Sequence, residues 1–173
     1  MGKTTFAGPV RSLAGFNPYG YNNEVNVADA AATITLTAAD HGGRIITVQD
    51  ADLAITLPSI VATEPSDPTS PDQLCNLGLT FRIYLSVAAT DVTITTAAAD
   101  NFVGGILIKS ETVAQSDTFF ADGDDDIITM NGTTKGGLEG SYVELTAITD
   151  GWLCSGSVLL GSSTLVTPFS ASA

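Results

Sequence analysis

Positive charge is the scarcest property of this 173-residue chain, which has six Lys and Arg residues against 19 Asp and Glu and a formal net charge of −13. The six are spread along the chain and form no patch: Lys3, Arg11, Arg44, Arg82, Lys109 and Lys135. Proteins bind nucleic acid and anionic lipid through clustered Lys and Arg. The sequence therefore predicts neither a nucleic-acid partner nor a membrane partner.

Long apolar runs are lacking as well. No stretch reaches the roughly 18 apolar residues of a membrane-spanning helix, and residues 1–20 contain no apolar run of signal-peptide length. We therefore expect the chain to stay where it is made unless assembly carries it elsewhere.

Histidine and cysteine are too few for most catalytic and metal sites. His41 is the only histidine and lies in a Gly-flanked turn, whereas a Ser-His-Asp triad holds its histidine rigidly between nucleophile and carboxylate. Cys75 and Cys154 lack metal-ligand spacing and lie beside apolar residues, so we interpret them as unpaired buried thiols, with a disulfide as the alternative. No nucleotide-binding glycine motif is present. We predict no enzymatic activity, no catalytic residue and no cofactor.

One acidic cluster invites a metal interpretation: Asp122, Asp124, Asp125 and Asp126. Carboxylates packed this closely repel one another unless a cation or solvent screens them. The cluster lacks the alternating acceptors, the distal Glu and the flanking helices of a calcium-binding EF-hand. We interpret it as a solvated loop, with a cation site as the alternative.

What the sequence has is short alternating segments. Leu79–Val87 is the strongest, because five apolar residues fall on one face of the expected strand. Similar runs occupy 33–37, 44–49, 53–58, 92–96, 118–120, 127–130, 141–148 and 152–160, and Gly104–Gly105 indicates a bulge or turn. We find no helix longer than a turn or two and no internal repeat. The pattern predicts an all-β, antiparallel sandwich or jelly-roll-like domain.

Turns and core residues follow from the same pattern. Asn131–Gly132, part of a glycosylation sequon, and Asp150–Gly151 are both expected to be hairpin turns. Residues 62–77, with three prolines, form a long loop. The side chains on the inward faces are predicted to form the core: Phe81, Ile83, Leu85, Ile127, Val143, Leu145 and Trp152.

The domain organisation is an N-terminal arm (1–28), a β-domain (29–160) and a C-terminal tail (161–173). Glycine and proline keep the arm out of regular structure, yet it is rich in apolar side chains. We expect it to become ordered by docking onto another protein, a sister subunit or its own domain. The residues predicted to make these contacts are Phe6, Val10, Arg11, Leu13, Phe16, Tyr19 and Tyr21.

Residues 36–60 and 78–83 resemble a module of bacteriophage capsid decoration (cement) proteins. The turn at 38–42, the strand ending in Leu57-Pro58 and the strand at 78–83 match its pattern, and 140–158 resembles its closing hairpin, with a small departure at 153–156. Residues 1–12 are similar to the start of several phage structural proteins. The loop 62–77 looks like an insertion between two strands of the module.

This resemblance implies a structural protein, made in the host cytoplasm and carried on the capsid exterior of the virion. There, a homotrimer would clamp neighbouring copies of the major capsid protein. One alternative is a phage tail or fibre component, although fibres usually show longer repeats or coiled coils. Another is a carbohydrate-binding module, which needs exposed aromatic side chains on one sheet face.

Overall fold

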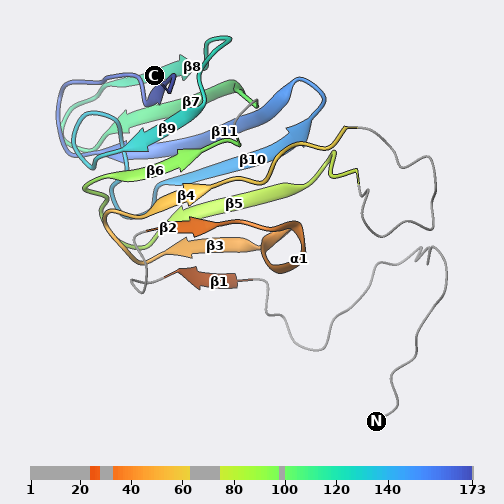
Figure 1. Cartoon of the computed structure of the whole chain (residues 1–173). Helices are drawn as coiled ribbons and strands as arrows, with labels where there is room; N and C mark the ends of the chain where they lie inside the picture. The colour runs from red at the N-terminus through yellow and green to blue at the C-terminus, as the bar shows by residue number, and fades with distance from the viewer. Residues whose placement is uncertain (1–23, 28–32, 63–74, 98–99, 173) are drawn as a thin grey trace, which may run out of the picture.

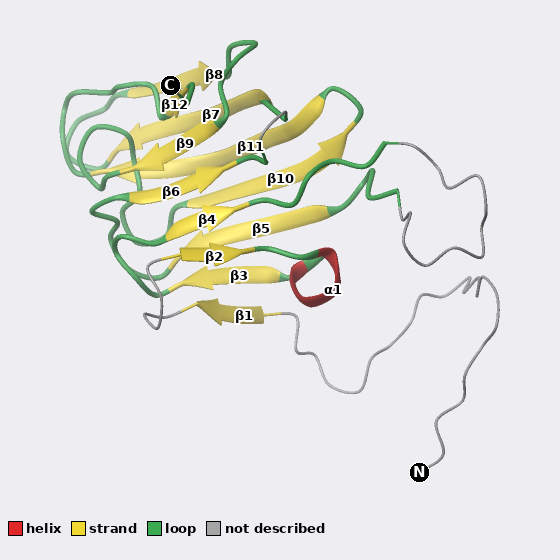
Figure 2. Cartoon of the chain, viewed as in Figure 1, coloured by secondary structure: helices red, strands yellow, loops and turns green. Residues whose placement is uncertain are grey.

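The computed structural model describes residues 24–27, 33–62, 75–97 and 100–172, which form two β-sheets packed face to face (Figures 1 and 2). The larger sheet has the strand order β1 (Glu24–Val27), β3 (Ile45–Val48), β5 (Thr80–Leu85), β10 (Tyr142–Ile148), β11 (Gly151–Leu160), β7 (Phe102–Ser110) and β8 (Ser116–Phe120). The smaller sheet has the order β12 (Phe169–Ser170), β9 (Ile127–Met130), β6 (Val92–Thr95), β4 (Ala54–Thr56) and β2 (Thr33–Thr35). Among the described residues the only helix is the single turn α1 (Ala38–His41).

The all-β sandwich predicted from the sequence is confirmed, but its strand pairing is mixed. β1, β3 and β5 are parallel to one another, and so are β2, β4 and β6. The reason is that the chain alternates between the two sheets over its first six strands. A strand in one sheet is followed by a return strand in the other, so successive strands of the same sheet run in the same direction. We call strands β1–β6 the β-coil. Each turn of the β-coil consists of one strand of the larger sheet and the next strand of the smaller sheet.

The β-coil contains an internal repeat that the sequence analysis missed. Val25 pairs with Ile46 and Ile34 pairs with Ile55, and both pairs are 21 positions apart. The third turn breaks this period, because Ile46 pairs with Ile83, 37 positions later. The long segment between β4 and β5, which includes residues 62–77, separates them and hides the period.

The core between the sheets contains six of the seven predicted residues at 0% exposure: Phe81, Ile83, Leu85, Val143, Leu145 and Trp152. The prediction for Ile127 is wrong. Ile127 is half-buried, and its neighbours Ile128 and Met130 face the core instead. Ile128 shares its face of the strand with Met130, whereas Ile127 shares its face with the polar Thr129, so the more apolar face is the one that is buried.

The two predicted hairpins have different outcomes. β10 and β11 form the expected hairpin, with Ile148 paired to Gly151. Asn131–Gly132 is not a hairpin turn, because β9 and β10 belong to different sheets. The Asn131 side chain instead accepts hydrogen bonds from the backbone N–H groups of residues 133–135, at 2.9–3.1 Å. It shapes a loop that crosses from one sheet to the other.

Gly104–Gly105 is neither a turn nor a register shift. β7 pairs with β11 without interruption through both glycines. Gly104 has φ +101°, and a Cβ there would collide with the carbonyl oxygen of Cys154. Glycine is needed at this position for backbone conformation and close approach.

Both ends of the predicted β-domain extend further than expected. Glu24–Val27, within the range assigned to the arm, forms β1, because Val25 and Val27 alternate with polar residues and pack on the core. In the tail, Phe169 on β12 lies against Phe102, with ring centroids 6.4 Å apart. No described helix has the length and apolar character to cross a bilayer.

Candidate interaction surface

The outward face of the larger sheet carries an apolar hollow near its β1 edge. Tyr84 on β5 and Tyr142 on β10 are direct cross-strand partners, and Ile45 on the next strand lies beside them. Tyr142 is 50% exposed and Ile45 is 42% exposed. We call this the tyrosine hollow, lined by Glu24, Ile45, Thr47, Arg82, Ile83, Tyr84, Gly140 and Tyr142.

Polar contacts frame the tyrosine hollow. The Nε of Arg82 donates to Glu144 across β5 and β10 at 2.6 Å. This ion pair is exposed, so it contributes about 0–1 kcal/mol to stability. On the other side, Thr47 donates from its hydroxyl to the Glu24 carboxylate at 2.5 Å, which ties β1 to β3. An apolar centre with a polar rim is the usual composition of a protein interface.

A second apolar group lies on the same face toward the β8 edge. Phe120 is 73% exposed, and its ring covers Gly105, where an added Cβ would lie 2.9 Å from the ring. Leu107 and Leu153, on neighbouring strands, are 38% and 44% exposed. We call Leu107, Phe120 and Leu153 the phenylalanine patch.

The hollow and the patch belong to one continuous face. Tyr84, Tyr142, Ser157 and Leu107 are successive cross-strand partners on β5, β10, β11 and β7. Exposed apolar side chains therefore occur at two places on this face, around Ile45 and Tyr142 and around Phe120, and the polar Ser157 lies between Tyr142 and Leu107. Clustered apolar side chains on one face mark interaction sites more often than isolated exposed residues do.

The arm residues predicted to make contacts lie outside the described residues: Phe6, Val10, Arg11, Leu13, Phe16, Tyr19 and Tyr21. What the structure does place is the point where the arm joins the domain. Glu24, the first described residue, begins β1 and lines the tyrosine hollow. The sequence analysis did not single out the tyrosine hollow. Alternation put Tyr84 and Tyr142 on outward faces, but only the strand register makes them neighbours.

His41 has a local role. Its Nδ1 accepts a hydrogen bond from the Thr37 backbone N–H at 3.0 Å, and the Thr37 hydroxyl donates to Asp40 at 3.0 Å while accepting from the Asp40 N–H. Thr37 is the N-cap of α1. These contacts all lie within five residues and stabilise one helical turn.

The acidic cluster is built into its loop through hydrogen bonds. The Asp125 carboxylate accepts from the Asp122 backbone N–H at 2.6 Å, and the Asp126 carboxylate accepts from the Ser172 N–H at 2.6 Å. These two carboxylates thus have separate partners. Within the described ranges, no three His, Cys, Asp or Glu side chains are grouped closely enough to hold a metal ion.

The two cysteines are free, which confirms the interpretation as unpaired thiols, but the prediction that both are buried is wrong for Cys75. Cys154 on β11 is buried and faces the core, whereas Cys75 is only half-buried. Burial raises the pKa of the Cys154 thiol to about 12. A thiol with a raised pKa is a poor nucleophile at neutral pH.

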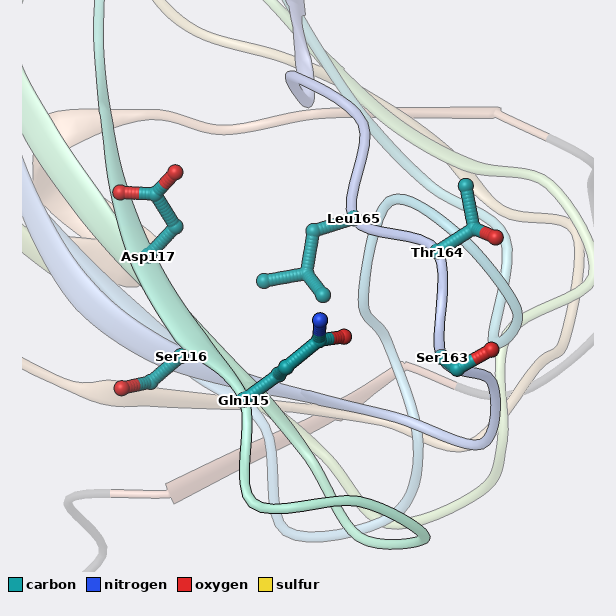
Figure 3. A pocket seen from close by; sticks show the side chains of 6 residues that line it. All are labelled: Gln115, Ser116, Asp117, Ser163, Thr164 and Leu165. Atoms are coloured by element: carbon teal, nitrogen blue, oxygen red, sulfur yellow. The ribbon is translucent and has the colours of Figure 1, made fainter.

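A further hollow lies between the start of β8 and the segment that follows β11. Figure 3 shows the Asp117 carboxylate on one side, the Ser163 and Thr164 side chains on the other, and Leu165 and Gln115 between them. Its lining is mostly polar, and Asp117 is its one charged group.

Comparison of the chain with protein-family models, curated proteins and solved structures gives no match.

Proposed function

We propose that this chain is a structural, non-catalytic phage protein that decorates the capsid exterior and stabilises contacts between major capsid proteins. The observation that carries the proposal is the apolar outward face of the larger sheet, formed by the tyrosine hollow and the phenylalanine patch. Aromatic residues in apolar surroundings are enriched among the side chains that dominate binding energy in protein interfaces. A face of this kind suits attachment to another protein.

The position of the module-like segments supports the same proposal. The segments that resemble decoration proteins include β3, β5, β10 and β11, which are adjacent strands of the larger sheet. These strands carry Ile45, Tyr84 and Tyr142 of the tyrosine hollow. The sequence resemblance and the apolar surface therefore coincide on one part of the molecule.

The arm adds a second element to the proposed contact. It joins the domain at Glu24, on the rim of the tyrosine hollow. Those of its predicted contact residues that do not pack on its own domain would extend the contact area beyond the sheet, toward the capsid or a neighbouring subunit. We propose a homotrimer as the attached form, on the virion exterior.

One observation favours a carbohydrate-binding module as a second candidate. Such a module needs aromatic side chains together on a sheet face, and Tyr84 and Tyr142 are direct neighbours there. Arg82 and Glu144 are the next cross-strand pair and supply polar groups beside them. A tail or fibre component remains a further alternative, using the same face for assembly.

The test uses phage heads that lack the protein. Wild-type chain and the double variant Tyr84→Ser/Tyr142→Ser are added to them, and occupancy is measured after sedimentation. We expect the double variant to bind at least about tenfold more weakly, since two partly desolvated aromatic rings are lost. Val166→Ser, which removes an exposed apolar side chain outside the larger sheet, is the matched control.

The outcomes separate the candidates. Wild-type binding to heads that is lost in the double variant and kept in Val166→Ser supports the proposal. Retention by an immobilised oligosaccharide with no binding to heads supports the carbohydrate-binding alternative. Binding to tails but not to heads supports the tail component.

A further inference from the structure

The β-coil has an open end. β1 is the end strand of the larger sheet and β2 is the end strand of the smaller one, and both lie at the same end of the sandwich (Figure 1). The Val27 carbonyl accepts from the N–H of Gln49, the residue after β3, and the Leu36 N–H, just after β2, donates to the carbonyl of Thr56 on β4. Successive residues of a strand direct their backbone N–H and C=O groups to opposite sides. The N–H and C=O groups of Asn26 and Thr35 therefore point along the free edges of β1 and β2. Edges with which no described strand pairs are ready templates for another strand.

Burial changes sharply between the first and second turns of the coil. Val25, Val27 and Ile34 point inward but are only half-buried. Their partners in the second turn are nearly inaccessible: Ile46 and Val48 at 0% and Ile55 at 1%. Among the residues that the structure describes, none covers the outer side of the first turn's inward face. In a stacked β-fold such a face needs a further layer.

The sequence before β1 matches the period of the coil. Shifted back by the 21-residue period, the strand positions 24–27 and 33–35 become 3–6 and 12–14. Two of the three inward places then receive apolar side chains, because Phe6 takes the place of Val27 and Leu13 that of Ile34, whereas Thr4 takes the place of Val25. The glycines and prolines of this region all fall outside those strand positions: Gly2, Gly8, Pro9, Gly15, Pro18 and Gly20.

The lengths of the connecting segments favour the same chain, and not a second copy, as the source of the added strands. β2 is joined to β3 by nine residues, 36–44, which carry the chain from the smaller sheet to the larger. Residues 15–23, between the shifted strand 12–14 and β1, also number nine. The fold already makes this crossing with that length of chain, so no second copy is needed.

We propose that the open end of the β-coil is the docking site for residues 3–14 of the same chain, which add a strand to β1 and a strand to β2. Phe6 and Leu13 then cover Val27 and Ile34. Val10 and Arg11 lie on one connecting segment, and Phe16, Tyr19 and Tyr21 lie on the other. Of the seven predicted contact residues, five remain for an external partner. This inference goes beyond the proposed function and does not depend on a capsid.

Amide hydrogen exchange of the full-length chain, followed by NMR, tests the proposal without a partner. The Asn26 and Thr35 N–H groups should exchange at least about 100-fold more slowly than in an unstructured peptide, because each gains a hydrogen bond from the added strand. Val27 and Ile34, whose N–H groups face β3 and β4, serve as internal references. Exchange of Asn26 and Thr35 at the unstructured rate, with the references protected, overturns the proposal.

A matched pair of variants tests which residues dock. Leu13→Asp places a charge at the inward position, whereas Ala14→Asp places one at the position equivalent to the exposed Thr35. We expect Leu13→Asp to accelerate Asn26 and Thr35 exchange at least about tenfold and Ala14→Asp to leave it within about twofold. Protected amides at Val48 and Ile94 show that each variant is folded. Equal effects of the two variants contradict the proposal.

Dilution distinguishes the same chain from a second copy. Protection of Asn26 and Thr35 that is unchanged over a hundredfold range of protein concentration supports docking within one chain. Protection that falls on dilution means that another copy donates the strands, and this overturns the assignment to the same chain.

Discussion

Phe81 on β5 and Trp152 on β11 pack ring against ring in the core, with centroids 5.6 Å apart and planes tilted by 30°. The strand between them is β10, where Ala147 is the direct partner of Trp152. The small methyl group of Ala147 leaves room for the indole to reach Phe81. This contact joins three neighbouring strands of the larger sheet, and both rings are fully buried.

The first prediction concerns this contact. Phe81→Ala should lower the free energy of unfolding by about 3–5 kcal/mol, because it removes a fully buried ring and leaves a cavity beside Trp152. Chemical denaturation followed by Trp152 fluorescence measures the change. Val166→Ala, at an exposed position, should change stability by less than about 0.5 kcal/mol. Similar midpoints for Phe81→Ala and wild type contradict the assigned packing.

The second prediction tests the register of β9. Ile128 is fully buried and pairs with Ile94, whereas the adjacent Ile127 is half-buried. Ile128→Ala should therefore cost about 2–5 kcal/mol, and Ile127→Ala clearly less. The two variants remove the same atoms one residue apart, so each is the control for the other. The reverse order of stabilities would restore the sequence-based prediction that Ile127 points inward.

These residues show how far the sequence could predict the fold. At 79–87 every second residue is apolar, so alternation alone identified Phe81, Ile83 and Leu85 as core. At 127–130 the alternation favoured the face of Ile128 and Met130 over that of Ile127 and Thr129, and the pairing of Ile128 with Ile94 confirms that face as the buried one. The Asn131–Gly132 signal was local and did not reveal that the chain changes sheets. The mixed pairing was also beyond local pattern, because strand direction depends on which sheet receives each strand.

The candidate surface was predictable only in part. Alternation placed Tyr84 and Tyr142 outward, but 58 residues separate them, and their contact depends on the register of β5 with β10. The 21-residue period of Val25 with Ile46 was present in the sequence. It was hidden because only two turns repeat before the long segment that precedes β5. The acidic cluster and His41 were visible as motifs, and the structure gives them local hydrogen-bonding roles.

The third prediction concerns thiol reactivity. Cys154 is buried with a pKa raised by burial to about 12, whereas Cys75 is half-buried. A thiol reagent at pH 8 should therefore modify Cys75 in the folded protein and leave Cys154 unmodified until denaturant is added. Mass spectrometry of the labelled peptides measures this, with Cys75→Ser as the control that removes the fast site. Fast labelling of Cys154 in the native state contradicts its burial.

The fourth prediction gives the pH dependence from the same thiol. The folded chain holds the Cys154 proton more tightly than the unfolded chain, whose thiol has the ordinary pKa of 9.0. The contribution to stability is therefore complete below pH 9 and is lost as the pH rises toward 12. Cys154→Ala removes this loss, so the stability difference between wild type and Cys154→Ala should shift against wild type above pH 9. A difference that stays constant from pH 8 to pH 11 contradicts the raised pKa.

The last prediction concerns assembly. Phe120 projects from β8, the end strand of the larger sheet, with 73% of its surface exposed. A ring this exposed contributes little to the fold of one chain, apart from its cover over Gly105. Burial of such a ring in an interface contributes about 1.5–3 kcal/mol. We expect the wild-type chain to form a trimer at micromolar concentration and Phe120→Ser to weaken it, as measured by light scattering.

Three outcomes are informative for this prediction. Trimeric wild type with a dissociated but folded Phe120→Ser variant places the phenylalanine patch in the contact between copies. The matched control is Val61→Ser, which removes a 40% exposed apolar side chain outside both sheets and should leave the trimer intact. A trimer that persists in Phe120→Ser excludes the Phe120 ring as a required part of the contact between copies. A wild-type monomer of 17.7 kDa, both free and on heads, contradicts the trimer itself.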